Sequence, residues 1–364
     1  MRTLAEGYQP LGRHDASDAM LGEILEEVRA EGNRSLEQAI LLERSRIRLF
    51  TGPDPVRLDA IREGAERALG DSLASEDHAG AAQAFFVLAS IHMRRGEIYE
   101  AEMEARRGLA HAVRSTHPRE ELAALWWIAW PLGAGKTPVP EAITISGDLV
   151  SWRGTEHPGV LSELAILRAM LGEFEAAREL VARARRLLVE RMRARRPLMF
   201  VAAASGVVEI LAGDPATAEI ELRKALAMAI EMAERHQTSE IAAELSRVLC
   251  SSGRYDEAGR LAALSMEAAP SESVVCQALW RAAKARVMAG GDEHREAEQL
   301  AGEAVGLAPM QMLNLRADLL IDLAEALIAG GDSNRAKAVI SNAVELYQEK
   351  GNLVSADQAR HISR

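Results

Sequence analysis

The sequence has few aromatic residues and only two cysteines, and these absences exclude several classes of protein. Aromatic residues make up 4% of the 364 residues, and the apolar content of 48% is dominated by alanine and leucine. This composition favours closely packed helices over β-sandwich layers. Cys250 and Cys276 form no CxxC motif and no cysteine–histidine cluster in the sequence. The sequence therefore supports neither a disulfide framework nor a zinc site, and we expect no cofactor.

The chain also lacks a basic excess and a long apolar run. Its formal net charge is −11, whereas a dedicated nucleic-acid binder normally carries positive charge that offsets phosphate. No uncharged apolar run approaches the roughly 20 residues that span a bilayer, and the N-terminus has no apolar core of the signal-peptide type. We therefore expect a cytoplasmic protein with two reduced thiols, without direct nucleic-acid or membrane partners.

What the sequence does contain is a repeated turn centred on glycine, followed by a helix with an early alanine. The clearest copy is SGRYDEA at 252–258. Copies of this pattern place turn glycines at Gly96, Gly172, Gly213, Gly253, Gly291 and Gly331. The spacing is 38 to 41 residues, except for 76 residues between the first two, which is two periods and predicts a degenerate turn at Gly135. Gly12 and Gly52 extend the series, so the sequence predicts nine helix pairs.

The pattern has a physical reason in the packing of two antiparallel helices. Glycine can take the left-handed conformation that ends the first helix, and acidic residues just after it favour the start of the second. A small residue five positions later, such as Ala258, lets the two backbones approach. Since stacked repeats share one continuous core, we predict an all-α fold. It is a right-handed α-solenoid that forms a single repeat domain over residues 1–364, with a degenerate repeat near 120–160.

Four segments carry a resemblance to known proteins: LEQAILLERSRIRLF at 36–50, TPVPEAI at 137–143, SGRYDEA at 252–258, and the stretch from 313 to 352. The chain resembles tetratricopeptide-repeat (TPR) arrays over nearly its whole length. More narrowly, it looks like the C-terminal repeat region of bacterial class III adenylate/guanylate cyclases that carry an AAA-type ATPase module. Regulators of the maltose-activator type have a similar array, but TPVPEAI and the final LYQEKGN favour the cyclase-linked group.

The resemblance implies a non-catalytic regulatory scaffold of bacterial signalling. Such a scaffold would bind a protein or peptide, or would dock on cyclase and ATPase modules of the same protein. The sequence shows neither of those modules, so no enzyme activity is carried over. Two other functions stay open: a small-molecule-sensing module of a transcription regulator, and a dimerising remnant of a signalling enzyme that would form a homodimer.

The segment GAGKT at 133–137 looks like the end of a phosphate-binding loop. That motif needs a glycine five positions before its last glycine and a strand leading into it. The required position is Trp130, and the preceding ELAALWWIAW looks helical. The sequence therefore predicts a turn between helices at Gly135 and no nucleotide site.

Two tryptophans on the helix before this turn are candidates for partner binding. Trp126 and Trp130 are four residues apart and share one helix face. Their helix is the first of a pair, which lines the concave groove in TPR arrays. The rings either fill gaps between helices, because large aromatic residues are mostly buried, or form a peptide-binding hot spot, where tryptophan is enriched.

A dense basic run is a second candidate. It comprises Arg183, Arg185, Arg186, Arg191, Arg193, Arg195 and Arg196. One interpretation is a solvated helix end, where cations suit the helix dipole. The other is a docking surface for an acidic partner, with Arg185, Arg186 and Arg193 as its candidate residues. Aromatic residues do not alternate with these arginines, which argues against nucleic acid.

The nine histidines show no HExxH motif or other ligand spacing, so we expect residues such as His14 and His236 to be surface or hydrogen-bonded core residues. A solenoid must cover its terminal cores with polar faces. The last helix is polar enough to do so. The apolar residues of the first, Leu21, Ile24, Leu25 and Val28, are expected to need another repeat or domain as cover.

Overall fold

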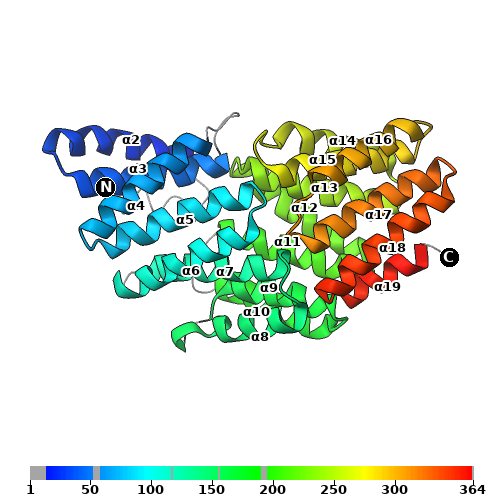
Figure 1. Cartoon of the computed structure of the whole chain (residues 1–364), viewed down its shortest axis with the longest axis horizontal. Coiled ribbons are helices and arrows are strands. Elements are labelled where there is room, and N and C mark those ends of the chain that lie inside the picture. The colour runs from blue at the N-terminus through cyan, green and yellow to red at the C-terminus, as the bar shows by residue number, and fades with distance from the viewer. Residues whose placement is uncertain (1–13, 52–57, 116–117, 155, 190–194, 363–364) are drawn as a thin grey trace.

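The computed structural model describes residues 14–51, 58–115, 118–154, 156–189 and 195–362. The prediction of an all-α solenoid is confirmed, because the described residues form eighteen α-helices and one short 3-10 helix, η1 (Trp152–Gly154), without a strand. Most helices follow one another as antiparallel pairs (Figure 1).

The first helices of the pairs are α3 (Arg34–Thr51), α5 (His78–Arg94), α7 (Pro118–Ala134), α9 (Pro158–Met170), α11 (Arg195–Ala212), α13 (Arg235–Ser251), α15 (Val274–Ala289) and α17 (Leu313–Ala329). The second helices are α4 (Leu58–Ala74), α6 (Ile98–Ser115), α8 (Val139–Val150), α10 (Phe174–Leu187), α12 (Pro215–Glu231), α14 (Tyr255–Ala268), α16 (His294–Leu307) and α18 (Ser333–Lys350). Helix α2 (His14–Glu31) precedes these eight pairs and α19 (Leu353–Ile362) follows them. The predicted ninth turn, at Gly12, and the turn at Gly52 lie outside the described residues.

Most of the predicted turn glycines take the left-handed backbone conformation. The φ angles lie between 71° and 83° at Gly96, Gly172, Gly213, Gly253 and Gly331. After Gly253, the amide of Arg254 donates to the carbonyl of Leu249, which caps the end of α13. Gly291 differs, because its φ is not positive and its amide donates to Met288 O over 3.0 Å. There the helix end is closed without a left-handed residue.

The predicted small residue allows close packing within each pair. Ala258 is fully buried, and its carbonyl accepts a 2.9 Å hydrogen bond from the Ser246 hydroxyl of the preceding helix. The corresponding alanines of other pairs are likewise buried: Ala101, Ala177, Ala218 and Ala336. A larger side chain at these positions would push the two helices apart.

The apolar face of α2 is buried within the described structure. Leu21, Ile24, Leu25 and Val28 are between 0% and 7% exposed and form a core cluster with Ile40 and Ile47 of α3. The expectation that these four side chains need a further repeat or domain to cover them is therefore wrong.

The array is curved, with its first helices on the inner side. Successive first helices contact one another from α3 to α11 and again from α13 to α17, whereas the second helices make no comparable contacts among the described residues. The ladder of first helices is interrupted between α11 and α13. This break divides the array into an N-terminal arm (α2–α11) and a C-terminal arm (α12–α19).

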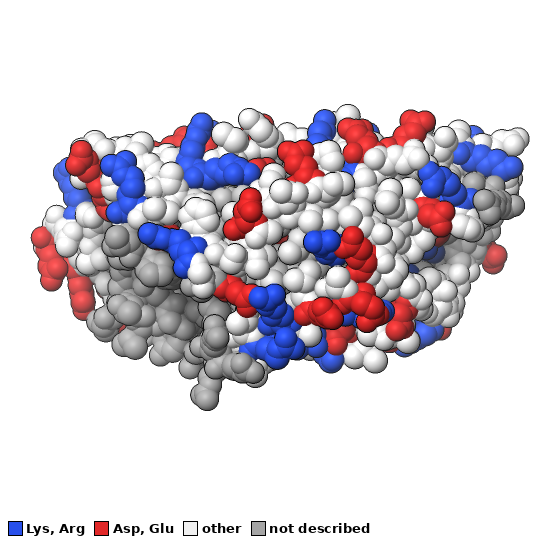
Figure 2. Space-filling view, turned by 90° about the horizontal axis from the view of Figure 1, so that it is seen from below, with Lys and Arg blue, Asp and Glu red and all other residues white. Residues whose placement is uncertain are grey.

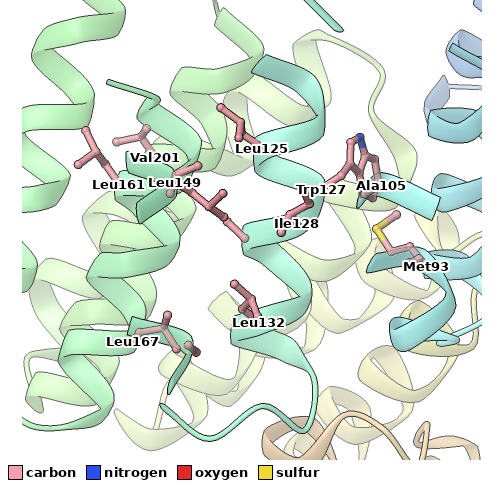
Figure 3. Packing of buried hydrophobic residues seen from close by; sticks show 14 of the residues in the cluster. Met93, Ala105, Leu125, Trp127, Ile128, Leu132, Leu149, Leu161, Leu167 and Val201 are labelled. Carbon is pink, nitrogen blue, oxygen red and sulfur yellow. The ribbon is translucent and has the colours of Figure 1, made fainter. Parts of the chain in front are cut away.

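The apolar core is largest in the N-terminal arm, where α7 lies between α5 and α9. Figure 3 shows Trp127 of α7 beside Met93 and Ala105, while Leu161 and Val201 lie on the other side of the helix. Trp127 is 7% exposed. This packing holds α7 between α5 and α9 on the inner side of the array.

The inner sides of the two arms face each other and touch. First helices of one arm contact helices of the other in three places, α3 with α13, α7 with α17 and α9 with α19. In Figure 1 the chain accordingly curls so that early and late helices lie side by side. We call this contact zone the seam, and it is where residues about 200 positions apart in sequence meet.

Candidate functional site

The seam is held by polar contacts that cross between the arms. The Lys350 ammonium at the end of α18 donates to the carbonyls of Leu132 and Thr137, each over 2.6 Å. Gln311, just before α17, accepts from the Tyr99 amide over 2.6 Å and donates to Glu100 over 3.2 Å. Removing such contacts would free the inner faces of both arms.

The segment that looked like a phosphate loop belongs to this seam. Helix α7 leads into it and α8 leads out, and Gly135 closes α7 by donating to Pro131 O over 2.8 Å. A Cβ atom on Gly135 would stand 2.8 Å from the same oxygen. Since the carbonyl of Thr137 accepts from Lys350, this turn presents acceptors to a cation, as no phosphate site would.

The inner face of the C-terminal arm carries a strip of buried ion pairs. Asp322 of α17 is 1% exposed and accepts from Arg247 over 3.2 Å and from Arg286 over 2.9 Å. Arg286 also donates to Glu325 over 2.7 Å. Because Arg247 and Asp322 lie two pairs apart, their contact spans α13, α15 and α17 across the inner face.

Beside this strip, Asp318 receives a hydrogen bond from the Tyr347 hydroxyl. Burial raises the pKa of the Asp318 carboxyl to about 6, although Arg247 and Tyr347 lower it. The strip therefore holds more carboxylates than its two arginines neutralise, and a cationic group brought to this face would be stabilised.

A cluster of cysteine, histidine and glutamate lies at the start of α13 and α15. The Cys276 sulfur is 3.4 Å from His236 Nδ1, and His236 Nε2 is 3.1 Å from Glu240 Oε1. Burial alone would lower the pKa of His236, but the charges of Cys276 and Glu240 outweigh it and raise the pKa to about 10. These three donors lie within 4.8 Å of one another.

This cluster could offer donors to a metal ion, but its geometry is that of a hydrogen-bonded chain. The two ring nitrogens of His236 face different partners, so one ion could not replace both contacts. The N-terminal arm also contributes a cation, since Arg94 is 2% exposed and its charge is favoured by Cys276 and Glu240. Burial lowers the pKa of Arg94. Cys276 and His236 form no cluster along the sequence, but the fold brings the two side chains together.

The buried carboxylate of Glu234 connects the two arms. Glu234 is 0% exposed, lies 3.0 Å from His14 Nε2 and accepts from the Arg196 guanidinium. Burial would raise the pKa of Glu234, but Arg196 and His14 hold it at about 2. His14 and His236 are thus hydrogen-bonded inner residues, as expected.

The inner face of the N-terminal arm has a depression over α3, α5 and α7. Its polar lining includes Glu43, Arg46, Gln83 and Glu120. Gln83 donates to Glu120 over 3.3 Å, and Arg46 donates to Glu43 over 2.7 Å. Such side chains can exchange these contacts for hydrogen bonds to a peptide backbone.

The candidate tryptophans are divided between core and seam. The Trp126 ring lies 4.9 Å from Trp127 and 5.0 Å from Phe200, so it packs within the N-terminal arm. Trp130 packs against a cluster that contains Ile98, Val275 and Met312 from both arms. Both rings are partly buried, and their role as a peptide-binding hot spot stays a prediction.

The structure gives most of the basic run partners within the chain. Arg185 donates to Glu221 over 2.6 Å, and Arg183 and Arg195 pair with Glu156 and Glu231. Arg186 is exposed, while Arg193 and Arg191 lie outside the described residues. Figure 2 shows acidic and basic residues interspersed over the face that it views. A docking surface for an acidic partner stays a prediction, with Arg186 as its exposed described member.

Sequence reasoning missed the inner charged residues and the seam. One signal was present: His236 and Cys276 are 40 residues apart, which is one repeat, so they begin successive first helices on the same face. Arg286 and Glu325, which pair on the same face, are 39 residues apart and also follow the repeat. Contacts between the arms have no such signal, because they depend on the accumulated curvature of many repeats.

Comparison with known proteins supports the repeat fold. No protein-family model and no curated sequence matches the chain. The structure of Rap protein complexed with competence and sporulation factor is similar over 100% of this chain and 99% of that chain, with a TM-score of 0.63 and 15% identity. NprR in complex with its cognate peptide NprX is similar over 89% and 97%, with a TM-score of 0.53 and 13% identity.

A third similar structure is a signal transduction ATPase with numerous domains and a TPR sensor, from Pyrococcus horikoshii. It has a TM-score of 0.50 and 13% identity, covers 83% of this chain and matches over 52% of its own length. At such identities the likeness defines the fold. The chain is a TPR-like helical repeat array. Among its described helices, none combines the length and apolar character needed to cross a bilayer.

Proposed function

We propose that this protein is a non-catalytic regulatory scaffold that binds a peptide or extended protein segment between the inner faces of its arms. The observation that carries the proposal is the placement of hydrogen-bonding and charged side chains on those faces, where Gln83, Glu244 and Asn314 lie on first helices. An extended segment offers backbone amides, carbonyls and side chains that can replace these contacts.

Two similar structures support a peptide ligand. Rap protein was determined in complex with competence and sporulation factor and NprR in complex with its cognate peptide, and both match nearly the whole array. A binding event in this chain would have to part the arms, since the seam closes the inner faces. Ligand binding would thereby change the shape of the whole array, which is what a regulator needs.

We also propose a biological setting for this scaffold. The resemblance to cyclase-linked repeat regions suggests a bacterial, cytoplasmic signalling role, in which the array could dock on ATPase or cyclase modules. The alternative of a small-molecule sensor stays open, with the depression over α3, α5 and α7 as its candidate site. A dimerising remnant would need an apolar surface between copies, and on the face in Figure 2 acidic and basic residues are scattered among the other residues.

The proposal is tested by selecting peptides from a random displayed library against the purified chain and measuring affinities by calorimetry. The informative variant is Glu244→Lys, which reverses a charge on the inner helix α13. Its matched control is Glu267→Lys on α14, where the side chain is exposed. We expect Glu244→Lys to weaken binding at least about tenfold and Glu267→Lys to leave it unchanged. Equal effects of both variants, or no selected peptide, would contradict the proposal.

A further inference from the structure

Cys276, His236 and Glu240 have the geometry of a nucleophile, a base and an orienting carboxylate. The sulfur lies 3.4 Å from Nδ1 of His236, and Nε2 of the same ring lies 3.1 Å from the Glu240 carboxylate. A histidine within hydrogen-bond reach of a thiol can take its proton as the sulfur reacts, and a carboxylate on the other ring nitrogen orients the imidazole. The thiolate is the reactive form of cysteine.

Two further features favour negative charge on the Cys276 sulfur. Cys276 lies in the first turn of α15, where its amide donates to the capping hydroxyl of Ser273 over 3.3 Å. The positive end of the helix dipole stabilises a thiolate there. The buried guanidinium of Arg94, from the other arm, adds a positive charge near the cluster.

The position of the cluster makes its accessibility depend on the seam. His236 and Glu240 lie on α13 and Cys276 lies on α15, two helices that pack directly on each other in the C-terminal arm. Arg94 belongs to α5 of the N-terminal arm. Cys276 is 0% exposed in the closed array. Ile98 of the N-terminal arm packs in one cluster with Val275, the neighbour of Cys276. The parting of the arms that the proposed function requires would therefore remove packing from the start of α15, while the three residues stay together on α13 and α15.

We propose that Cys276 is an activated thiol, paired with His236, which is oxidised by hydrogen peroxide or an organic hydroperoxide when the arms part. The thiolate sulfur attacks one peroxide oxygen, the S–O bond forms and the O–O bond breaks. The sulfur loses two electrons and becomes a sulfenic acid. The leaving hydroxide, or alkoxide for an organic hydroperoxide, takes the proton from the His236 imidazolium and departs as water or alcohol, so atoms and charge balance.

The chain supplies its own reference thiol. Cys250 is 7% exposed near the end of α13, within helix packing, and burial raises its pKa to about 11. The test exposes the full chain to limiting hydrogen peroxide, traps sulfenic acid with a dimedone-type probe and quantifies both cysteine peptides by mass spectrometry. We expect Cys276 to be trapped at least about tenfold faster than Cys250. Equal rates at the two cysteines would overturn the proposal.

Two variants separate chemical activation from accessibility. His236→Gln keeps a polar side chain but removes the base, so the rate at Cys276 should fall about tenfold or more while Cys250 is unchanged. Lys350→Met removes the seam contacts of Lys350 and should raise the rate at Cys276 alone. If His236→Gln unfolds the chain, both cysteines will react quickly and Glu240→Gln replaces it, with the same expected fall. If His236→Gln or Glu240→Gln folds and Cys276 is still oxidised at the wild-type rate, the role of the cluster is refuted.

Discussion

At the scale of single residues, the inner face is distinguished by buried charges that are matched across repeats. Glu234 is neutralised by Arg196 and His14, and Asp322 by Arg247 and Arg286. Burying a charge is unfavourable unless a partner and hydrogen bonds offset the loss of hydration. The retention of several such pairs on one face is therefore expected of a surface that exchanges these contacts for those of a ligand.

Glu163 gives a pH-dependent test at this scale. Burial raises the pKa of its carboxyl from 4.5 to about 7, and a hydrogen bond with Trp126 partly offsets the shift. Because the pKa of Glu163 is higher in the folded state than in the unfolded state, the protonated carboxyl favours folding. This contribution to stability is fully present below the unfolded pKa of 4.5 and is lost as pH rises through about 7. Glu163→Gln should therefore gain up to about 3 kcal/mol over the wild type between pH 5 and pH 8.

Urea denaturation at the two pH values measures this difference. The exposed Glu267→Gln variant is the control and should show the same pH dependence as the wild type. A constant difference between Glu163→Gln and the wild type across this range would contradict the assigned environment of Glu163.

Ala258 tests the close packing of helix pairs. Its side chain is fully buried between α13 and α14, so Ala258→Leu should destabilise the fold by about 1 to 3 kcal/mol through overpacking. Ala263→Leu, on the exposed side of the same helix, should change stability by less than about 0.5 kcal/mol. Comparable losses in both variants, measured by urea denaturation, would show that helix propensity and not packing sets the effect.

At the scale of elements, the helices and turns could largely be predicted from the sequence. Helix periodicity and glycine spacing are local properties, so they identify the helix pairs around Gly96, Gly213 and Gly253. The turn at Gly135 was also placed correctly between α7 and α8. The conformation at Gly291 was not predictable, because the preceding Gly290 continues the helical end and a left-handed residue is not required.

The different backbone conformations of Gly253 and Gly291 predict opposite effects of an alanine substitution on stability. Gly253 has a φ of 71° with open space around its Cα, so Gly253→Ala is destabilised by backbone strain of about 1 to 2 kcal/mol. Gly291 lacks a positive φ, so Gly291→Ala should be neutral or stabilise by about 0.4 to 1 kcal/mol. Thermal and urea denaturation measure both, and an equal loss at the two sites would argue against the described turn geometry.

At the scale of the whole molecule, the closed arrangement of the arms could not be predicted. Trp126 and Trp130 were correctly placed on a first helix, but which ring reaches the other arm depends on how small rotations add up over many repeats. The Lys350 contact with Thr137 joins residues 213 positions apart. The sequence contains no local pattern for such a contact, whereas the inner charges at least share the repeat phase.

Lys350 makes the closed arrangement sensitive to pH. Burial lowers the pKa of Lys350 from 10.5 to about 7, and the neutral amine can still donate to both carbonyls. Because the pKa of Lys350 is lower in the folded state than in the unfolded state, folding is favoured more at high pH. This contribution to stability is lost as pH falls through about 7. The stability of the wild type relative to Lys350→Met should therefore rise between pH 7 and pH 10.

The control for this prediction is Lys337→Met, which removes an exposed lysine from the same helix. Its stability relative to the wild type should not depend on pH. Small-angle scattering should also detect an increased radius of gyration in Lys350→Met if the arms part. A pH-independent difference for Lys350→Met would contradict the buried position of the ammonium group.

The central claim, that a peptide is held between the inner faces, is tested most directly by hydrogen–deuterium exchange with and without a selected peptide. We predict increased protection of the first helices α5, α7, α13, α15 and α17, on both sides of the seam, with little change in α4, α14 and α16. Protection confined to the second helices, or to one arm alone, would contradict the account.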